Sequence, residues 1–167
     1  YGPNDLVLDA PLTINVRGSG PWSPQNYTRK YSGEVTLTRA LAQSLNTATI
    51  RLQEIAGRDA VRRVASDFGV SNELATGPSL GLGVSDATLL NMTAAYAGIR
   101  NGGTAVRPYG LEELRIKGDD QALIGQAGGM GQRVISQKAA GELIGMMQQV
   151  IEHGTGTRAK LKGRPAA

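Results

Sequence analysis

Cysteine is absent from the 167 residues, and histidine, phenylalanine and tryptophan occur once each. Without cysteine there can be no disulfide and no thiolate zinc site. The single histidine, His153, cannot build a histidine-based metal cluster or catalytic triad, so we expect neither a metal nor a cofactor. Aromatic residues make up 4% of the chain, which predicts a core of aliphatic side chains.

Long apolar runs and strong net charge are also lacking. No run approaches the roughly 20 residues that a membrane-spanning helix needs. The net charge is +4, and the densest basic stretch, residues 158–164, contains no interleaved aromatic residue. Nucleic-acid binding is therefore not expected, and this stretch is interpreted as solvated surface.

Apolar residues recur at spacings of three and four, which is the helical pattern. Glycine, asparagine and proline separate the helical stretches and predict turns between them. Helices are expected over residues 37–56, 61–68, 86–100 and 137–153, a short strand over residues 12–16, a hairpin over residues 105–124, and irregular chain over residues 126–132. Thr36 or Thr38 is expected to cap the first helix, and Ser85 and Ser136 are expected to cap the third and fourth. We therefore predict one mainly helical α+β unit with a hairpin.

The tripeptide Ser44-Leu45-Asn46 lies inside the first predicted helix. Residues two apart on an α-helix are separated by about 200° of rotation, so Ser44 and Asn46 could not face one cleft on a continuous helix. Either the two side chains serve no joint purpose, or the backbone breaks between them. The apolar spacing through Leu45 and Ala48 favours a continuous helix with two ordinary polar residues.

Seven segments, in order along nearly the whole chain, resemble the transpeptidase domains of class A penicillin-binding proteins. The longest is Val-Thr-Leu-Thr-Arg-Ala-Leu-Ala-Gln-Ser-Leu-Asn-Thr, residues 35–47. The others are residues 9–14, 22–27, 78–83, 94–97, 150–157 and 163–167. Together these segments are more specific than the Ser-x-Asn motif alone.

The resemblance implies the α+β fold shared by serine β-lactamases and DD-peptidases, with this chain as mainly its helical portion. It also implies an enzyme that cross-links peptidoglycan stem peptides through a serine acyl-enzyme and is acylated by β-lactams. Ser44 would carry protons between a lysine and the leaving amine, and Asn46 would bind the substrate or hold that lysine. In this family the Ser-x-Asn motif lies at a break between two helices.

Two motifs of the resembled family are missing from these residues: Ser-x-x-Lys, which carries the nucleophile, and Lys-Thr-Gly or Lys-Ser-Gly. We expect the first before Tyr1 and the second after Ala167, so residues 1–167 would be a partial domain that is inactive alone. The expected partners are stem peptide, β-lactams and the remainder of the domain. The parent protein would be membrane-anchored, with this domain outside the cytoplasm. The alternative is a non-catalytic module that binds cell-wall peptide or protein.

Three further features have structural interpretations. His153 and the glycines that follow it imitate the third motif, but they are expected to form a helix end. The stretch 81–83 either lines the cleft or marks a tight crossing between elements. Trp22 and Tyr27 are expected to anchor their loop on the core.

Overall fold

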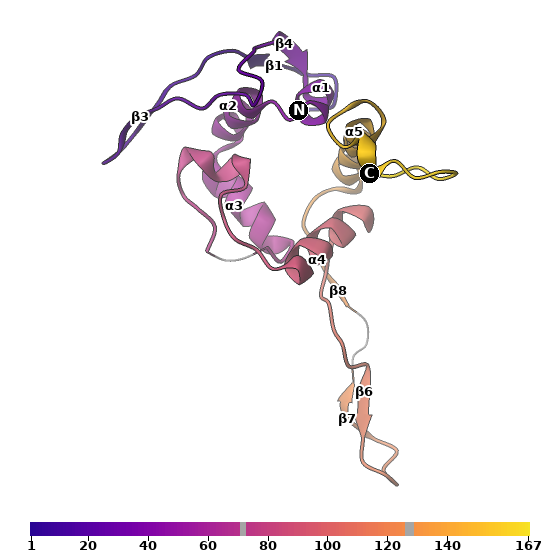
Figure 1. Ribbon diagram of the computed structural model, residues 1–167. Coiled ribbons are helices and arrows are strands. Elements are labelled where there is room, and N and C mark those ends of the chain that lie inside the picture. Colours follow the sequence, from indigo (N-terminus) through magenta and orange to yellow (C-terminus); the bar gives the residue numbers. More distant parts are fainter. Residues whose placement is uncertain (71–72, 126–128) are drawn as a thin grey trace.

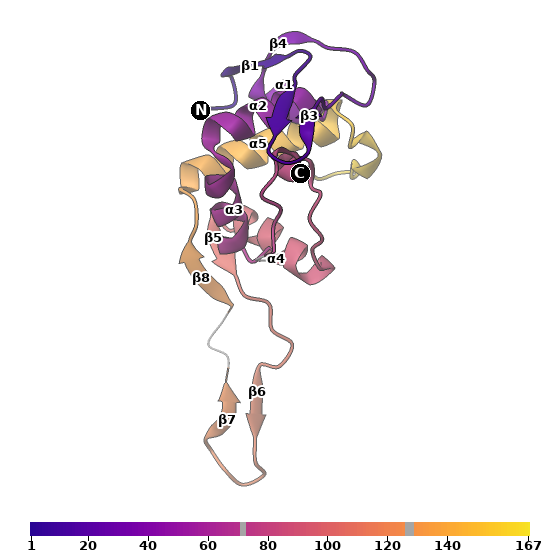
Figure 2. The ribbon, with the colours of Figure 1, turned by 90° about the vertical axis from the view of Figure 1, so that its left-hand side faces the viewer.

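The computed structural model describes residues 1–70, 73–125 and 129–167. Its elements in chain order are β1 (Leu6–Asp9), β2 (Ile14–Val16), β3 (Gly20–Trp22), β4 (Gly33–Thr36), α1 (Leu37–Ala42), α2 (Asn46–Ala56), α3 (Arg58–Asp67), η1 (Pro78–Leu82), α4 (Leu89–Arg100), β5 (Thr104–Val106), β6 (Glu113–Arg115), β7 (Ala122–Gly125), β8 (Met130–Arg133), α5 (Gln137–His153) and η2 (Thr157–Ala159). Helices α1 to α5 follow one another round a ring (Figure 1), and the β6–β7 hairpin projects away from the helices (Figures 1 and 2).

The strands form four separate antiparallel pairs rather than one sheet: β1 with β4, β2 with β3, β5 with β8, and β6 with β7. The β1–β4 pair does most to position residue 44, because β4 runs directly into α1 at Leu37. Within the described residues, no helix is long and apolar enough to cross a membrane.

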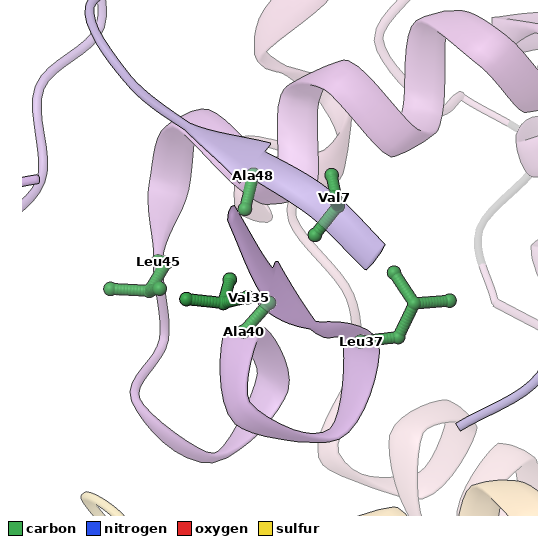
Figure 3. Packing of buried hydrophobic residues seen from close by; sticks show 6 residues of the cluster. All are labelled: Val7, Val35, Leu37, Ala40, Leu45 and Ala48. Carbon is green, nitrogen blue, oxygen red and sulfur yellow. The ribbon is translucent and has the colours of Figure 1, made fainter. Parts of the chain in front are cut away.

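The core lies where β1 and β4 meet α1 and α2. It is a cluster of small and medium aliphatic side chains, Val7, Val35, Leu37, Ala40, Leu45 and Ala48 (Figure 3). Met146 of α5 packs against this cluster from outside. Burial of each larger aliphatic side chain contributes about 1.5–3 kcal/mol. The cluster therefore fixes the chain on both sides of residue 44, and the predicted aliphatic core is confirmed.

Two of the three helix caps predicted from the sequence are confirmed. The Thr36 hydroxyl accepts a hydrogen bond from the Arg39 N–H at 3.2 Å, and the Ser136 hydroxyl accepts one from Ala139 at 3.1 Å. The third helix was predicted too early: Thr88 caps α4, whereas Ser85 Oγ accepts the Ala75 N–H at 2.8 Å.

Several expectations need correction. The continuous helix over residues 37–56 is wrong, because α1 ends at Ala42 and α2 begins at Asn46. Strands β1, β3 and β4 were not predicted. Strand β8 begins inside the stretch 126–132 that was expected to be irregular, of which residues 126–128 lie outside the described residues. Tyr27 is 98% exposed and anchors nothing, since its loop is held by buried polar groups instead. The hairpin is confirmed, with Leu114 opposite Ile124.

Candidate active site at the α1–α2 break

The break between α1 and α2 is a helix-ending turn with serine in the position that usually holds glycine. Ser44 has a φ of 53°, in the left-handed region. Its N–H donates to the Leu41 carbonyl at 3.1 Å, and the Leu45 N–H donates to the Ala40 carbonyl at 3.0 Å. This pair of bonds defines a Schellman motif. A serine kept in a strained conformation is a pointer to function.

The turn brings Ser44 and Asn46 to one hollow. Both residues line a pocket of about 610 Å³, together with side chains from residues 26–32 and from the turn after α5. Ser44 is exposed and Asn46 is half-buried. The two residues that a continuous helix would place on different faces therefore line one pocket.

Asn46 is held by the loop before β4. Its Nδ2 donates to the Gln25 carbonyl at 2.8 Å. Within the described residues its Oδ1 has no hydrogen-bond partner, so the amide can still accept a hydrogen bond. Asn46 is also the first residue of α2, which places it at the positive end of that helix.

Beneath the pocket lies a buried carboxylate that the sequence did not reveal. Asp9, at the end of β1, is 0% exposed. Its Oδ1 accepts hydrogen bonds from Asn26 Nδ2 at 2.8 Å and from Thr47 Oγ1 at 2.5 Å, and its Oδ2 accepts the Ser32 N–H at 2.8 Å. Asn26 Oδ1 in turn accepts the Thr47 N–H at 3.3 Å. Asp9 thus ties the 26–32 loop to the first turn of α2.

The hydrogen bonds keep Asp9 ionised despite its burial. Burial raises the pKa of Asp9, but the hydrogen bonds from Thr47, Asn26 and Ser32, with the charge of Arg51, hold that pKa below its ordinary value. Hydrogen bonds to an ionised carboxylate are stronger than those between neutral groups, so Asp9 holds together the segments that supply its donors.

The turn after α5 forms another wall of the pocket. The prediction of a helix end at His153 is confirmed, since α5 ends there, and His153, Gly154 and Thr155 also line the pocket. Gly81 does not line it. A Cβ at Gly81 would lie 2.8 Å from Gln53 Oε1, so this glycine marks a tight crossing between η1 and α2. The described residues contain no group of three acidic or histidine side chains that could hold a metal.

The strain at Ser44 gives a stability prediction. Ser44→Gly is expected to raise the free energy of unfolding by about 0.5–1 kcal/mol, because glycine adopts the left-handed conformation without steric cost. Ser44→Ala keeps the strain and should not be stabilised. Urea unfolding of the three chains measures the difference, and equal stability of the glycine and alanine variants would contradict the prediction.

Comparison with known proteins now defines the class. The family model for the penicillin-binding protein transpeptidase domain matches residues 3–167. The chain therefore belongs to the penicillin-binding protein transpeptidase domain family.

Within that family, penicillin-binding proteins 1A and 1B are among the curated proteins that the chain resembles. Penicillin-binding protein 1B of Haemophilus influenzae is 33% identical over 153 residues, covering 91% of this chain and 19% of that protein. Penicillin-binding protein 1B of Escherichia coli is 31% identical over 166 residues, covering 97% of this chain and 19% of that protein. The chain thus spans about a fifth of the length of these two relatives.

Solved structures establish the fold. Penicillin-binding protein 1A from Haemophilus influenzae superposes with a TM-score of 0.80 at 24% identity, over 93% of this chain and 29% of that one. The imipenem acyl-enzyme complex of penicillin-binding protein A from M. tuberculosis gives a TM-score of 0.77 at 24% identity, over 99% of this chain and 42% of that one. The predicted transpeptidase-type α+β fold is confirmed.

Proposed function

We propose that this chain supplies the Ser-x-Asn part of a peptidoglycan DD-transpeptidase active site. The observation that carries the proposal is the Schellman turn at Ser44. It holds a serine where glycine is favoured, and Ser44 and Asn46 line the same pocket. A turn with a purely structural role would not require serine there.

The proposed reaction is acyl transfer in two steps. A nucleophilic serine outside these residues attacks the carbonyl of the D-Ala–D-Ala bond, and the terminal D-Ala leaves as an amine. An amine of a second stem peptide then attacks the acyl-enzyme and releases the serine, which completes the cross-link. A β-lactam acylates the same serine and remains attached.

Ser44 and Asn46 have distinct roles in this scheme. The Ser44 hydroxyl can accept and donate a proton at once, so it passes a proton toward the leaving amine. The Asn46 amide, held by the Gln25 carbonyl, presents its free oxygen to a donor in the pocket. The parent protein would be anchored in the cytoplasmic membrane with this domain on the outer side.

The test is covalent labelling with a fluorescent penicillin. In the natural protein that contains this segment, we expect an adduct that survives denaturation and maps to a serine outside residues 1–167. The isolated chain is expected to remain unlabelled, because it lacks Ser-x-x-Lys. An adduct on the isolated chain would contradict the proposal. A natural protein that binds stem peptide without any adduct would instead establish the non-catalytic binding module.

A further inference from the structure

We propose that the turn after α5, residues 153–156, positions Ser44 by holding the last turn of α1 in place. This inference rests on the proposed function of Ser44, and it assigns to the turn after α5 a positioning role that acts on Ser44 through α1. The contact point is the backbone of Ala42, two residues before Ser44.

The first part of the contact is a hydrogen bond between distant segments. The Thr155 N–H donates to the Ala42 carbonyl at 3.0 Å. Carbonyls in the last turn of a helix have no partner within that helix. Helix α1 has only six residues, so few bonds of its own fix its C-terminal end. The Thr155 N–H, just after α5, therefore restrains the end of α1 that has the fewest hydrogen bonds of its own.

The second part is a close approach that only glycine permits. A Cβ built at Gly154 would lie 2.2 Å from the Ala42 oxygen and 2.9 Å from the Ala42 carbonyl carbon. Both of these are backbone atoms, so no side-chain rotation can relieve the conflict. Gly154 has φ −109° and ψ −155°, an extended conformation open to any residue. The same Cβ would lie 2.9 Å from Val150 Cα, so glycine is required here for space, most severely against α1 and also against the end of α5, and not for its backbone conformation.

The anchor itself is firmly held. The N–H groups of Gly154 and Gly156 both donate to the Val150 carbonyl, at 3.1 and 3.0 Å. Farther back on α5, Met146 packs against the core cluster that contains Ala40 and Leu45. The end of α5 can therefore hold the backbone of Ala42 in place. Because only one residue separates Ala42 from Ser44, the position of Ser44 is restrained as well.

The experiment compares two glycine-to-alanine changes on α5 and its end, made in the natural protein that contains this segment. A Cβ at Gly145 meets no atom within 4 Å, so Gly145→Ala is the matched control for Gly154→Ala. Acylation by fluorescent penicillin is resolved into a first-order rate constant and a half-saturating concentration. We expect Gly154→Ala to lower the rate constant about 10-fold or more, since small misplacements of catalytic groups have effects up to about 10²-fold. The half-saturating concentration should change less than about threefold, and Gly145→Ala should match wild type.

Equal rate constants for Gly154→Ala and Gly145→Ala would overturn the positioning role, as would a change confined to the half-saturating concentration. Hydrogen exchange on the unmodified natural protein that contains this segment tests the contact without any variant. The Thr155 amide should be protected, and an unprotected amide would overturn the proposal. Measuring Ser44→Ala in the same assay separates the two proposals. A wild-type acylation rate for Ser44→Ala refutes the proposed role of Ser44. A slow rate for Ser44→Ala together with a wild-type rate for Gly154→Ala refutes the positioning role alone.

Discussion

Replacing Asp9 by alanine is expected to lower the free energy of unfolding by about 3 kcal/mol or more, the largest loss from any single side chain of this site. The change removes the acceptor of three groups: one N–H of the Asn26 amide, the Thr47 hydroxyl and the Ser32 N–H. The other N–H of the Asn26 amide still donates to the Lys30 carbonyl at 2.9 Å. Each unsatisfied buried donor costs about 1–3 kcal/mol, although water entering the vacated space offsets part of this. The corresponding fall in melting temperature is roughly 6–12 °C.

Two further variants make the experiment specific. Glu34→Ala removes an exposed carboxylate from the strand that pairs with β1, and we expect a change within about 0.5 kcal/mol. Asp9→Asn keeps the side-chain shape and one acceptor oxygen, but its amide group would face a donor. Its loss should therefore fall between those of Glu34→Ala and Asp9→Ala. Equal stability of Asp9→Ala and Glu34→Ala in urea unfolding would refute the organising role of Asp9.

The contribution of Asp9 also depends on pH in a defined direction. Because the folded-state pKa lies below the ordinary value, the unfolded chain takes up the proton at higher pH than the folded chain. The stabilisation is therefore fully present above the unfolded-state pKa of about 3.9 and is lost as the pH falls through the folded-state pKa. The difference in unfolding free energy between wild type and Asp9→Ala should be constant between pH 5 and 7 and shrink below pH 4.

Features set by neighbours in sequence could be predicted from the sequence. The capping residues Thr36 and Ser136 act on N–H groups three positions away, and the hairpin partners Leu114 and Ile124 flank a turn rich in glycine and aspartate. In these cases the residues that make the contact are close enough along the chain for spacing to reveal them.

The break at Ser44 could not be predicted from apolar spacing. Leu45 and Ala48 are core residues, as the helical pattern requires, but they are buried because α2 turns back onto the same cluster as α1. A pattern of burial cannot distinguish one helix from two that share a core. Glycine at position 44 would have signalled the turn; serine does not. Only the resemblance to a family placed a break there.

The Asp9 network was missed for a related reason. Its donors lie 17, 23 and 38 residues away along the chain, so no local spacing connects them. A lone aspartate two residues before a proline, as in Asp9-Ala10-Pro11, is most simply interpreted as part of a turn. Its burial follows from the pairing of β1 with β4, and neither strand was predicted.

Ser44→Ala in the natural protein is expected to slow acylation by a labelled β-lactam by roughly 10²-fold or more, the scale of general acid–base catalysis. The change removes the only group that we assign to proton transfer within this chain. It leaves the Schellman turn intact, because both hydrogen bonds of that turn are made by backbone atoms. The fold and the shape of the pocket should therefore survive, and the loss should fall on the rate of the chemical step.

The matched control is Ser32→Ala, which removes a second serine hydroxyl from the same pocket. Within the described residues the Ser32 hydroxyl has no hydrogen-bond partner, and its N–H bond to Asp9 comes from the backbone and is retained. We expect Ser32→Ala to acylate within about twofold of wild type, because it takes no part in proton transfer. If Ser44→Ala folds normally and acylates as fast as Ser32→Ala, then the hydroxyl at position 44 carries no proton, and the strained turn must have another purpose.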